Sequence, residues 1–340
     1  MSGEAGKRRP TLAMVAREAG VSAPTVSKVL NGHGNIAPDT RARIEALLVE
    51  HDYVPRSAAR RRSPLQSLTL VFDTFENPYG MEITRGVLHA AAESGITVSL
   101  DLTSLPGSGT DWLDRVLGAA PSALLLVTTA LTAPQRKRLV KHNLPFVVID
   151  PLNLPGPEVT SVGATNWAGA LAAVEHLIGL GHQRIGAIIG RPETSFGGAR
   201  LHGYRSAHEN AGLPIDTALV ASGDFRFEPA LRHALRLLNL ADRPTAIFAS
   251  SDIQALGVLE AARQLEIRVP HELSVVTFDD TLLAKVTAPP LTAVRQPFAE
   301  MGRAATQILQ RMVAGEQPES HRIELATHLV VRGSTRPPRA

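Results

Sequence analysis

From Ser67 onward the chain alternates short, continuously apolar runs with segments of helix length. Continuous apolar runs are typical of strands buried on both faces, as in parallel sheets covered by helices. Segments such as "NWAGALAAVEHLIGLG" have helical periodicity. Seven such runs exceed one small sheet, so the pattern predicts an α/β domain of two Rossmann-like lobes, with a ligand cleft near the carboxyl ends of the strands. The runs are "LTLVF", "ITVSLDL", "ALLLVTT", "FVVID", "RIGAIIG", "TAIFAS" and "LSVVTFDD".

The charge of the chain is unevenly divided. Residues 1–66 carry eleven Lys and Arg against six Asp and Glu, a net charge of +5, whereas the remainder carries 24 against 26, a net charge of −2. A small basic segment on a near-neutral body is typical of binding to a phosphate backbone, because lysine and arginine release counterions condensed on a polyanion. The alternative is an N-terminal extension that only adds solubility, so the residue pattern has to decide.

Residues 11–54 have the pattern of three short helices. In "TLAMVAREAGVSAPTVSKVLNG", Gly20 lies where a left-handed helix end favours glycine, Ser22 lies at an N-cap, and Pro24 lies in the first turn of the second helix. A third helix is expected to begin at Pro38. The short turn makes the first two helices cross steeply, which predicts an all-α helix-turn-helix head whose second helix enters the major groove. The alternative is an ordinary helical hairpin, and the basic excess favours DNA.

The same stretch and "TRARIEALLVEHDYVPRSAAR" resemble the DNA-binding head of the lactose-repressor (LacI/GalR) family. The likeness covers almost the whole chain, because "ENPYGMEITRG", "VVIDPL", "GHQRIGAI", "ARLHGY", "AIFASSD" and "VTFDD" follow the family's effector domain, which is similar to periplasmic sugar-binding proteins. The resemblance implies a head at residues 1–54, a hinge at 55–66 and an effector and dimerisation domain at 67–340, with lobes at about 67–165 plus 293–324 and 166–292 plus 325–340.

Base-reading positions are implied by the resemblance at Ala23, Pro24 and Lys28. Alanine and proline side chains have no hydrogen-bonding groups, so we expect base discrimination to depend on apolar contact, for example with thymine methyl groups, and on Lys28. The remaining implied DNA contacts lie in the head and hinge, at Thr11, Ser22, Thr25, Ser27, Asn31, Asn35, Arg56, Ala59 and Arg62.

The hinge segment "PRSAARRRSPLQ" has the composition of a solvated linker. In the resembling family it is a helix that orders on DNA and inserts a leucine into the minor groove at the operator centre. That position holds Arg62 here. An arginine suits a narrow, electronegative minor groove, so we expect Arg62 to lie along the groove rather than between bases. The alternative is that Leu65, three residues later, takes the wedge role.

Ligand positions in the effector domain are also implied by the resemblance. Their chemistry suits a polyhydroxylated molecule, because a carboxylate accepts from hydroxyls, a guanidinium donates in a planar fork and an aromatic ring covers an apolar sugar face. These positions also have ordinary explanations, namely helix caps for Asp150 and Asp279, a surface ion pair for Arg200 and a place in the core for Phe225. We expect His182 to mark only a helix-to-strand turn and Asp252 to be only a helix cap. The implied ligand residues are Tyr79, Asp150, Arg200, Phe225, Ser251 and Asp279.

Several classes of protein are disfavoured. The segment after the first strand has no G-x-G-x-x-G run, and the chain has neither a phosphate loop nor a G-x-S-x-G elbow, which argues against an enzyme. The chain has no cysteine, so disulfides and thiolate metal sites are excluded, and we expect no cofactor and no metal. No apolar run is long enough for a membrane span, and "MSGEAGKRRP" lacks the apolar stretch of a signal peptide, so we expect a cytoplasmic protein. A secreted sugar-binding protein explains the cleft but not the head.

These patterns predict a ligand-responsive transcriptional regulator, expected to be a repressor of a carbohydrate-utilisation operon. We expect a homodimer on a pseudo-palindromic double-stranded DNA operator, with one head per half-site. The ending "VVRGSTRPPRA" lacks the apolar heptads that make tetramers in some family members. The small-molecule effector is expected to be a sugar, and a purine or another metabolite is the alternative.

The divided charge gives a first prediction. Operator affinity of the full chain should fall steeply with salt, with a log-log slope of several units, because each neutralised phosphate releases counterions. Residues 67–340 alone should not bind DNA. Fluorescence anisotropy with labelled operator, between about 50 and 200 mM salt, measures both quantities. DNA binding by the truncated chain would contradict the assignment of the head.

Overall fold

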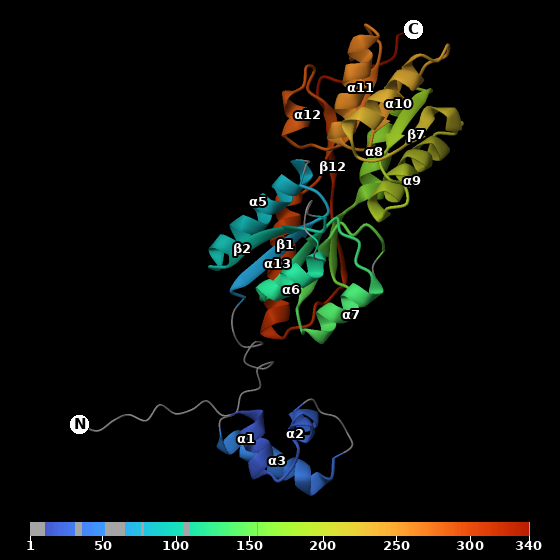
Figure 1. The fold of residues 1–340 in the computed structure, drawn as a ribbon. Coiled ribbons are helices and arrows are strands. Elements are labelled where there is room, and N and C mark those ends of the chain that lie inside the picture. The colour runs from blue at the N-terminus through green and yellow to red at the C-terminus, as the bar shows by residue number, and fades with distance from the viewer. Residues whose placement is uncertain are drawn as a thin grey trace, which may run out of the picture. The chain divides into compact units, whose positions relative to one another are not determined.

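The computed structural model describes residues 11–30, 36–51, 65–75, 78–104, 109, 111–154 and 156–339, within two compact units of residues 1–64 and 65–340 (Figure 1). The first unit contains α1 (Leu12–Glu18), α2 (Ala23–Leu30) and α3 (Pro38–Glu50). One residue of each helix, Val15, Val26 and Ile44, is completely buried in the small core that these helices share. The predicted helical head is confirmed.

Capping residues explain where the first two helices begin and end. The hydroxyls of Thr11 and Ser22 accept hydrogen bonds from the backbone N–H groups of Met14 and Thr25, each at 3.3 Å. Gly20 has a φ of +65°, in the left-handed region that favours glycine, and separates α1 from α2 within a short turn. α3 begins at Pro38, as the sequence predicts.

The second unit is built on two sheets, and each sheet with its helices forms one lobe. The first sheet is parallel throughout and has the order β11-β5-β4-β3-β1-β2. Helices α5 and α13 cover one face, and α6 and α7 cover the other. The elements are β1 (Ser67–Phe72), α5 (Pro78–Glu93), β2 (Thr97–Leu102), α6 (Trp112–Ala119), β3 (Ala123–Val127), α7 (Ala133–Lys141), β4 (Phe146–Ile149), β5 (Ser161–Ala164), α13 (Phe298–Ala314) and β11 (Arg322–Leu325).

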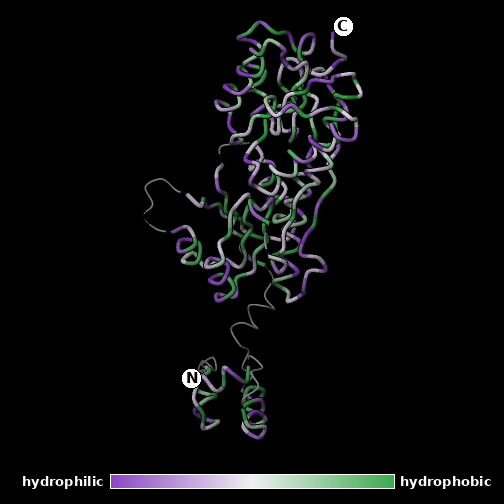
Figure 2. Tube along the Cα trace, turned by 90° about the vertical axis from the view of Figure 1, so that its right-hand side faces the viewer, coloured by the Kyte–Doolittle hydropathy of each residue, from purple (hydrophilic) through white to green (hydrophobic). Residues whose placement is uncertain are grey.

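The second sheet has the order β12-β10-β9-β8-β6-β7, in which only β12 is antiparallel to its neighbour. Helices α8 and α9 cover one face, and α10 and α11 cover the other. Figure 2 shows hydrophobic residues gathered in the interior of both lobes. The elements are α8 (Asn166–Gly179), β6 (Ile185–Ile189), α9 (Ser195–Asn210), η1 (Thr217–Leu219), β7 (Val220–Ser222), α10 (Phe227–Leu238), β8 (Ala246–Ala249), α11 (Asp252–Gln264), β9 (Ser274–Asp279), α12 (Leu282–Val286), β10 (Thr292–Arg295) and β12 (His328–Val330).

Three connections cross between the lobes, from β5 to α8, from β10 to α13 and from β11 to β12. The first and third are joined, because the backbone N–H of Thr327 donates to the Thr165 hydroxyl at 2.9 Å and the two hydroxyls lie 3.0 Å apart. The expected lobe boundary at residue 293 falls inside β10, which pairs in the second sheet, so the second crossing follows Arg295. The predicted two-lobed α/β architecture is confirmed. No helix in the parts of the chain described is long and apolar enough to cross a membrane.

The contact between α5 and α13 gives a second prediction. A Cβ on Gly86 would lie 2.3 Å from the backbone oxygen of Ala299, so the two helices pack too closely for a side chain there. Gly86→Ala should therefore lower the free energy of unfolding by about 1–3 kcal/mol. Gly118→Ala in α6 has open space around the new Cβ and should be neutral or stabilising. Urea unfolding of both variants tests this, and equal stabilities would contradict the close packing.

Candidate functional site

A cavity of about 650 Å³ lies between the lobes, where the carboxyl ends of strands from both sheets face each other. The cavity brings together all six implied ligand residues, Tyr79 and Asp150 from the first lobe and Arg200, Phe225, Ser251 and Asp279 from the second. Open α/β sheets bind ligands at this end of their strands. The structure thus brings the six side chains together, and their contact with a ligand stays a prediction.

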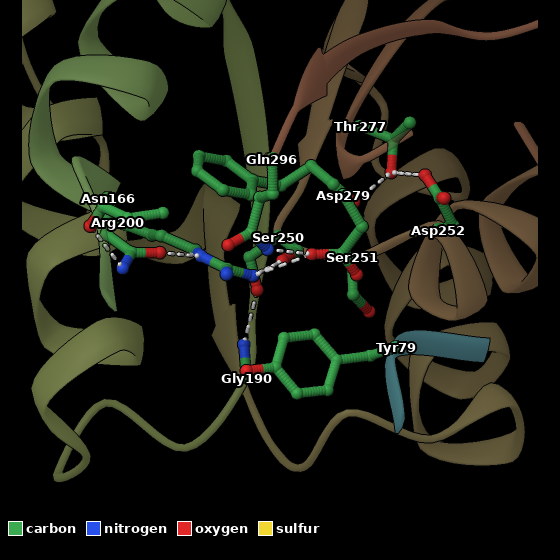
Figure 3. A network of polar contacts seen from close by, with 12 residues as sticks. Tyr79, Asn166, Gly190, Arg200, Ser250, Ser251, Asp252, Thr277, Asp279 and Gln296 are labelled. Atoms are coloured by element: carbon green, nitrogen blue, oxygen red, sulfur yellow. Dashed lines mark hydrogen bonds and ion pairs between the residues drawn. The ribbon is translucent and has the colours of Figure 1, made fainter. Parts of the chain in front are cut away.

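Arg200, on α9, is joined to residues at the ends of three other elements by polar contacts (Figure 3). Its side chain is only 4% exposed. Its Nε donates to Asn166 Oδ1 at 2.8 Å, and its Nη1 donates to the Ser250 carbonyl at 2.6 Å and lies 3.5 Å from Asp279 Oδ1. The guanidinium carbon is 3.9 Å from the centre of the Phe278 ring. The alternative of a surface ion pair is therefore wrong.

Asp279 ends β9 with a φ of +113° and accepts a hydrogen bond from Gln296 Nε2 at 2.7 Å. Burial raises the pKa of its carboxyl to about 6, although the charge of Arg200 opposes the rise. Asp279 does not cap a described helix, because the N-cap of the following α12 is Thr281. Its carboxylate is thus free of a capping role and lies beside a buried cation at the cavity.

Asp252 is not the helix cap that we expected. The N-cap of α11 is Ser251, whose hydroxyl accepts from the Gln254 N–H at 3.3 Å. The Asp252 carboxylate instead accepts from the backbone N–H and the hydroxyl of Thr281, at 2.7 and 2.8 Å, and from Thr277 Oγ1 at 3.1 Å. Burial raises its pKa to about 7, and the charge of Asp279 adds to the rise. Asp252 therefore fixes the loop that directly follows Asp279 at the end of β9.

The first lobe contributes a hydrogen-bonded pair. Tyr79, at the start of α5, donates from its hydroxyl to Asp150 Oδ2 at 2.7 Å, and Asp150 follows β4 with a φ of +43°. Burial raises the pKa of both groups. Asp150 caps none of the described helices. One carboxylate oxygen of Asp150 thus has a fixed donor within the same lobe, and the tyrosine stays protonated.

Two phenylalanines line the cavity beside Arg200. The ring centres of Phe225 and Phe196 are 5.4 Å apart, and each lies within 6 Å of the guanidinium carbon. Gly190, which follows β6, allows this placement, because a Cβ there would lie 2.2 Å from the Phe225 ring. Phe225 is half-buried at a cavity and does not belong to a core cluster among the described residues.

Some cavity residues were missed by the sequence reasoning, among them Asp73, Arg191, Phe196 and Asp224. Three of these, Asp73, Arg191 and Asp224, lie within two residues of the carboxyl ends of β1, β6 and β7. A charged residue just after a strand was therefore the sequence signal for them. Arg191 and Asp73 also connect the lobes, with Arg191 Nη2 3.8 Å from Asp73 Oδ2. Another contact between the lobes is the hydrogen bond from the Ser195 N–H to the Leu152 carbonyl at 2.9 Å.

His182 lies in the turn between α8 and β6, as expected. Its ring is buried, with Nδ1 2.8 Å from Thr245 Oγ1 and Nε2 2.9 Å from the Arg336 carbonyl. Burial lowers the pKa of the imidazole. The residue therefore acts in packing, remote from the carboxyl ends of the strands.

In the head, Ala23, Pro24 and Lys28 are exposed on α2, whereas Thr25 and Ser27 are partly buried. Thr11 and Ser22 are exposed and act as the caps described above. Leu65 is only 5% exposed and packs in the core of the first lobe, which argues against a wedge role for it. The other implied DNA contacts, Asn31, Asn35, Arg56, Ala59 and Arg62, lie outside the described residues.

Comparison with known proteins agrees with both units. The family of bacterial regulatory proteins of the lacI type matches residues 11–56, and the periplasmic binding protein-like domain matches residues 174–335. The HTH-type transcriptional regulator CelR of Thermobifida fusca is 36% identical over 337 residues, covering 96% of this chain and 99% of the relative. The HTH-type transcriptional repressor CytR of Escherichia coli (strain K12) is 32% identical over 329 residues, 96% of each chain.

Among solved structures, a transcriptional regulator CelR–cellobiose complex has a TM-score of 0.72 at 34% identity and covers 96% of this chain and 100% of that chain. A helix-turn-helix head joined to a two-lobed ligand domain defines a transcriptional regulator. The chain belongs to the LacI family of bacterial regulatory proteins. The predicted family and regulator class are confirmed, and so is the expectation that the chain is not an enzyme, because its close relatives are transcriptional regulators.

The buried carboxyls give a third prediction. Because the folded-state pKa of Asp279 is raised, the native protein binds more protons than the unfolded chain between about pH 4 and pH 6. The contribution of this group to stability is therefore present at low pH and is lost as the pH rises through about 6. The Tm of Asp279→Asn should fall less between pH 5 and pH 7.5 than that of the wild type, by roughly a few degrees. Parallel pH profiles would contradict the raised pKa.

Proposed function

We propose that this regulator binds an operator through its head and is controlled by a sugar in the cavity between its lobes, most simply as a repressor of carbohydrate-utilisation genes. The observation that carries the proposal is the buried Arg200 guanidinium, which lies with Asp279 beside two phenylalanine rings in one cavity. Planar donors, carboxylate acceptors and aromatic faces together recognise a molecule with many hydroxyls on an apolar ring. A protein that represses genes on DNA is expected in the cytoplasm.

Each of the six residues has a role in this proposal. Arg200 donates to ring hydroxyls, Asp279 and Asp150 accept from them, and Phe225 covers the apolar face of the ring. Tyr79 orients Asp150 through its 2.7 Å hydrogen bond, and Ser251 contributes a hydroxyl at the start of α11. The similarity to CelR, which was solved with cellobiose, makes cellobiose the first sugar to test. A purine remains the second candidate, because the phenylalanine pair also suits a flat base.

We infer that sugar binding is coupled to DNA binding through the arrangement of the lobes. A ligand held by residues of both lobes favours the arrangement in which they are close, and the ion pair between Arg191 and Asp73 adds to that arrangement. The difference in ligand affinity between the two arrangements is the free energy available for control. Whether the sugar releases the operator or promotes binding is decided by which arrangement the DNA-bound state uses.

On the operator, Ala23, Pro24 and Lys28 face the bases in this proposal, because they are exposed on α2. The N-terminus of α2 adds an oriented group of N–H donors for a phosphate. The remaining proposed contacts to the DNA backbone and minor groove are Thr11, Ser22, Thr25, Ser27, Asn31, Asn35, Arg56, Ala59 and Arg62.

A homodimer is proposed because one small head offers too little contact for tight, specific binding. The surface offers apolar side chains for a second copy. Met81 and Leu88 on α5 and Leu100 on β2 are exposed, and α5 packs against β2 (Figure 1). In the second lobe, Leu282 and Val286 on α12 are exposed as well. Apolar side chains in such number are favoured at contacts between copies.

The fourth prediction tests the cavity. Arg200→Ala should reduce cellobiose affinity at least 100-fold, because it leaves Asp279 without its cation and removes the donors, while operator affinity stays within about twofold. Isothermal titration with cellobiose and anisotropy with operator DNA measure the two affinities. The matched control is Arg205→Ala, which alters an exposed arginine on the same helix.

Arg200→Lys keeps the positive charge and should retain the Tm of the wild type but bind sugar weakly. This variant therefore separates a loss of sugar binding from a loss of folding. Unchanged sugar binding by Arg200→Lys and Arg200→Ala would overturn the pocket assignment. Failure of the wild type to bind any sugar would overturn the effector class.

A further inference from the structure

One buried polar atom at the cavity has no partner. Asp224 lines the cavity next to Phe225, in the segment between β7 and α10, and its Oδ1 is enclosed without any hydrogen-bond donor among the described residues. An acceptor that is removed from water and left unpaired costs about 1–3 kcal/mol. Such a cost in a folded protein calls for an explanation.

The usual structural roles of an aspartate at this place are not filled by Asp224. It precedes α10, but the N-cap of that helix is Arg226 and no side chain caps it. Asp224 forms no ion pair within the described part of the chain, although its negative charge opposes the lowering of the pKa of His233. Neither capping nor charge pairing therefore explains the carboxylate.

The backbone of this segment is nevertheless firmly held. The Asp224 carbonyl accepts from Gln254 Nε2 at 3.0 Å, and Gln254 Oε1 in turn accepts from the Ser250 hydroxyl at 2.8 Å. Gln254 and Ser250 are both buried. The backbone that carries the carboxylate is thus held in place next to Phe225 before any ligand arrives, as a group prepared for recognition should be.

Charge over the whole cavity favours an uncharged ligand. Its lining contains six carboxylates and three guanidiniums. Two of the guanidiniums are already matched, Arg200 with Asp279 and Arg191 with Asp73. Arg226 is the third guanidinium, so the carboxyl groups outnumber the guanidiniums two to one. A phosphorylated sugar would therefore bring its negative charge into a cavity whose lining is predominantly acidic.

We propose that Asp224 is a further contact of the effector, accepting a hydrogen bond from a sugar hydroxyl, and that its charge selects uncharged sugars against phosphorylated ones. The proposal rests on the sugar-binding function proposed above. It adds a specificity-determining residue in the second lobe, next to Phe225 in the cavity lining. An ammonium group is the other donor that suits this carboxylate, and an amino sugar therefore belongs in the test.

Isothermal titration of the full chain with cellobiose, glucose, glucosamine and glucose 6-phosphate tests the proposal on the wild type, Asp224→Asn and Asp224→Ala. We expect cellobiose or glucose to bind the wild type and glucose 6-phosphate not to bind. Asp224→Asn keeps the size of the side chain and should lower the affinity for the neutral sugar about tenfold. It should also reduce the ratio between the affinities for the neutral sugar and for glucose 6-phosphate. Tighter binding of glucosamine than of glucose would show that Asp224 recognises an ammonium group and not a hydroxyl. That result would overturn the preference for uncharged sugars.

The control is Asp242→Asn, which removes the same charge from an 84% exposed side chain in the same lobe and should leave every affinity unchanged. The Tm without ligand supplies a second readout. Because the unpaired Oδ1 lowers the stability of the folded protein, neither Asp224 variant should be less stable than the wild type. A fall of several degrees would show a structural role and overturn the proposal.

Sugar binding that survives Asp224→Asn unchanged would overturn the role of Asp224 and leave the proposed function standing. Absence of sugar binding by the wild type would overturn both, and tight binding of glucose 6-phosphate would overturn only the charge selection.

Discussion

The buried guanidinium of Arg200 is the group on which the arrangement of the site depends. A charge with a 4% exposed side chain is tolerated only when it is paired and hydrogen-bonded. Its partners come from the start of α8, the end of β8 and the end of β9, through Asn166, Ser250 and Asp279. The cation is therefore accommodated only because α8 begins and β8 and β9 end at these positions. The second lobe is in this sense organised around one side chain of α9.

The same network reaches the connections between the lobes. Asn166 is the first residue after the crossing from β5, and Gln296, which donates to Asp279 at 2.7 Å, directly follows β10 at the second crossing. The hydroxyls of Thr165 and Thr327 join the first crossing to the third. A change in the contacts of Arg200 or Asp279 therefore acts on residues next to the hinge-like crossings. This contiguity gives the proposed coupling a physical route through packed groups.

Much of this fold could be predicted because most of its strands lie in continuous apolar runs, and every one of the seven predicted runs contains a strand. The strands that sequence reasoning missed are short and carry weak signals, such as "SVGA" in β5 and "VAS" in β7, or lie at sheet edges with partly exposed residues, as β11 does. The six implied ligand residues were found through resemblance, which records where side chains converge. Asp252 and Asp224 show what such reasoning leaves out. A helix-start aspartate has the same local pattern whether it caps the helix or, as Asp252 does, holds a distant loop through Thr281.

Several costs to stability meet at the cavity. Thr128, Asp150 and Asp279 all have positive φ values at strand ends, a backbone region that costs about 1–3 kcal/mol for each residue other than glycine. Burial raises the pKa values of the carboxyls of Asp150 and Asp279, and Asp224 Oδ1 has no donor among the described residues. None of these features improves the packing of the unliganded protein, whereas the cores of both lobes are filled with fully buried apolar side chains that offset them. A molecule that supplies hydroxyl donors relieves the unpaired acceptor and favours the ionised carboxylates. Binding of such a molecule therefore offsets the free-energy cost of the unpaired acceptor and of the buried carboxyls. This gain is largest when residues of both lobes contact the molecule at once.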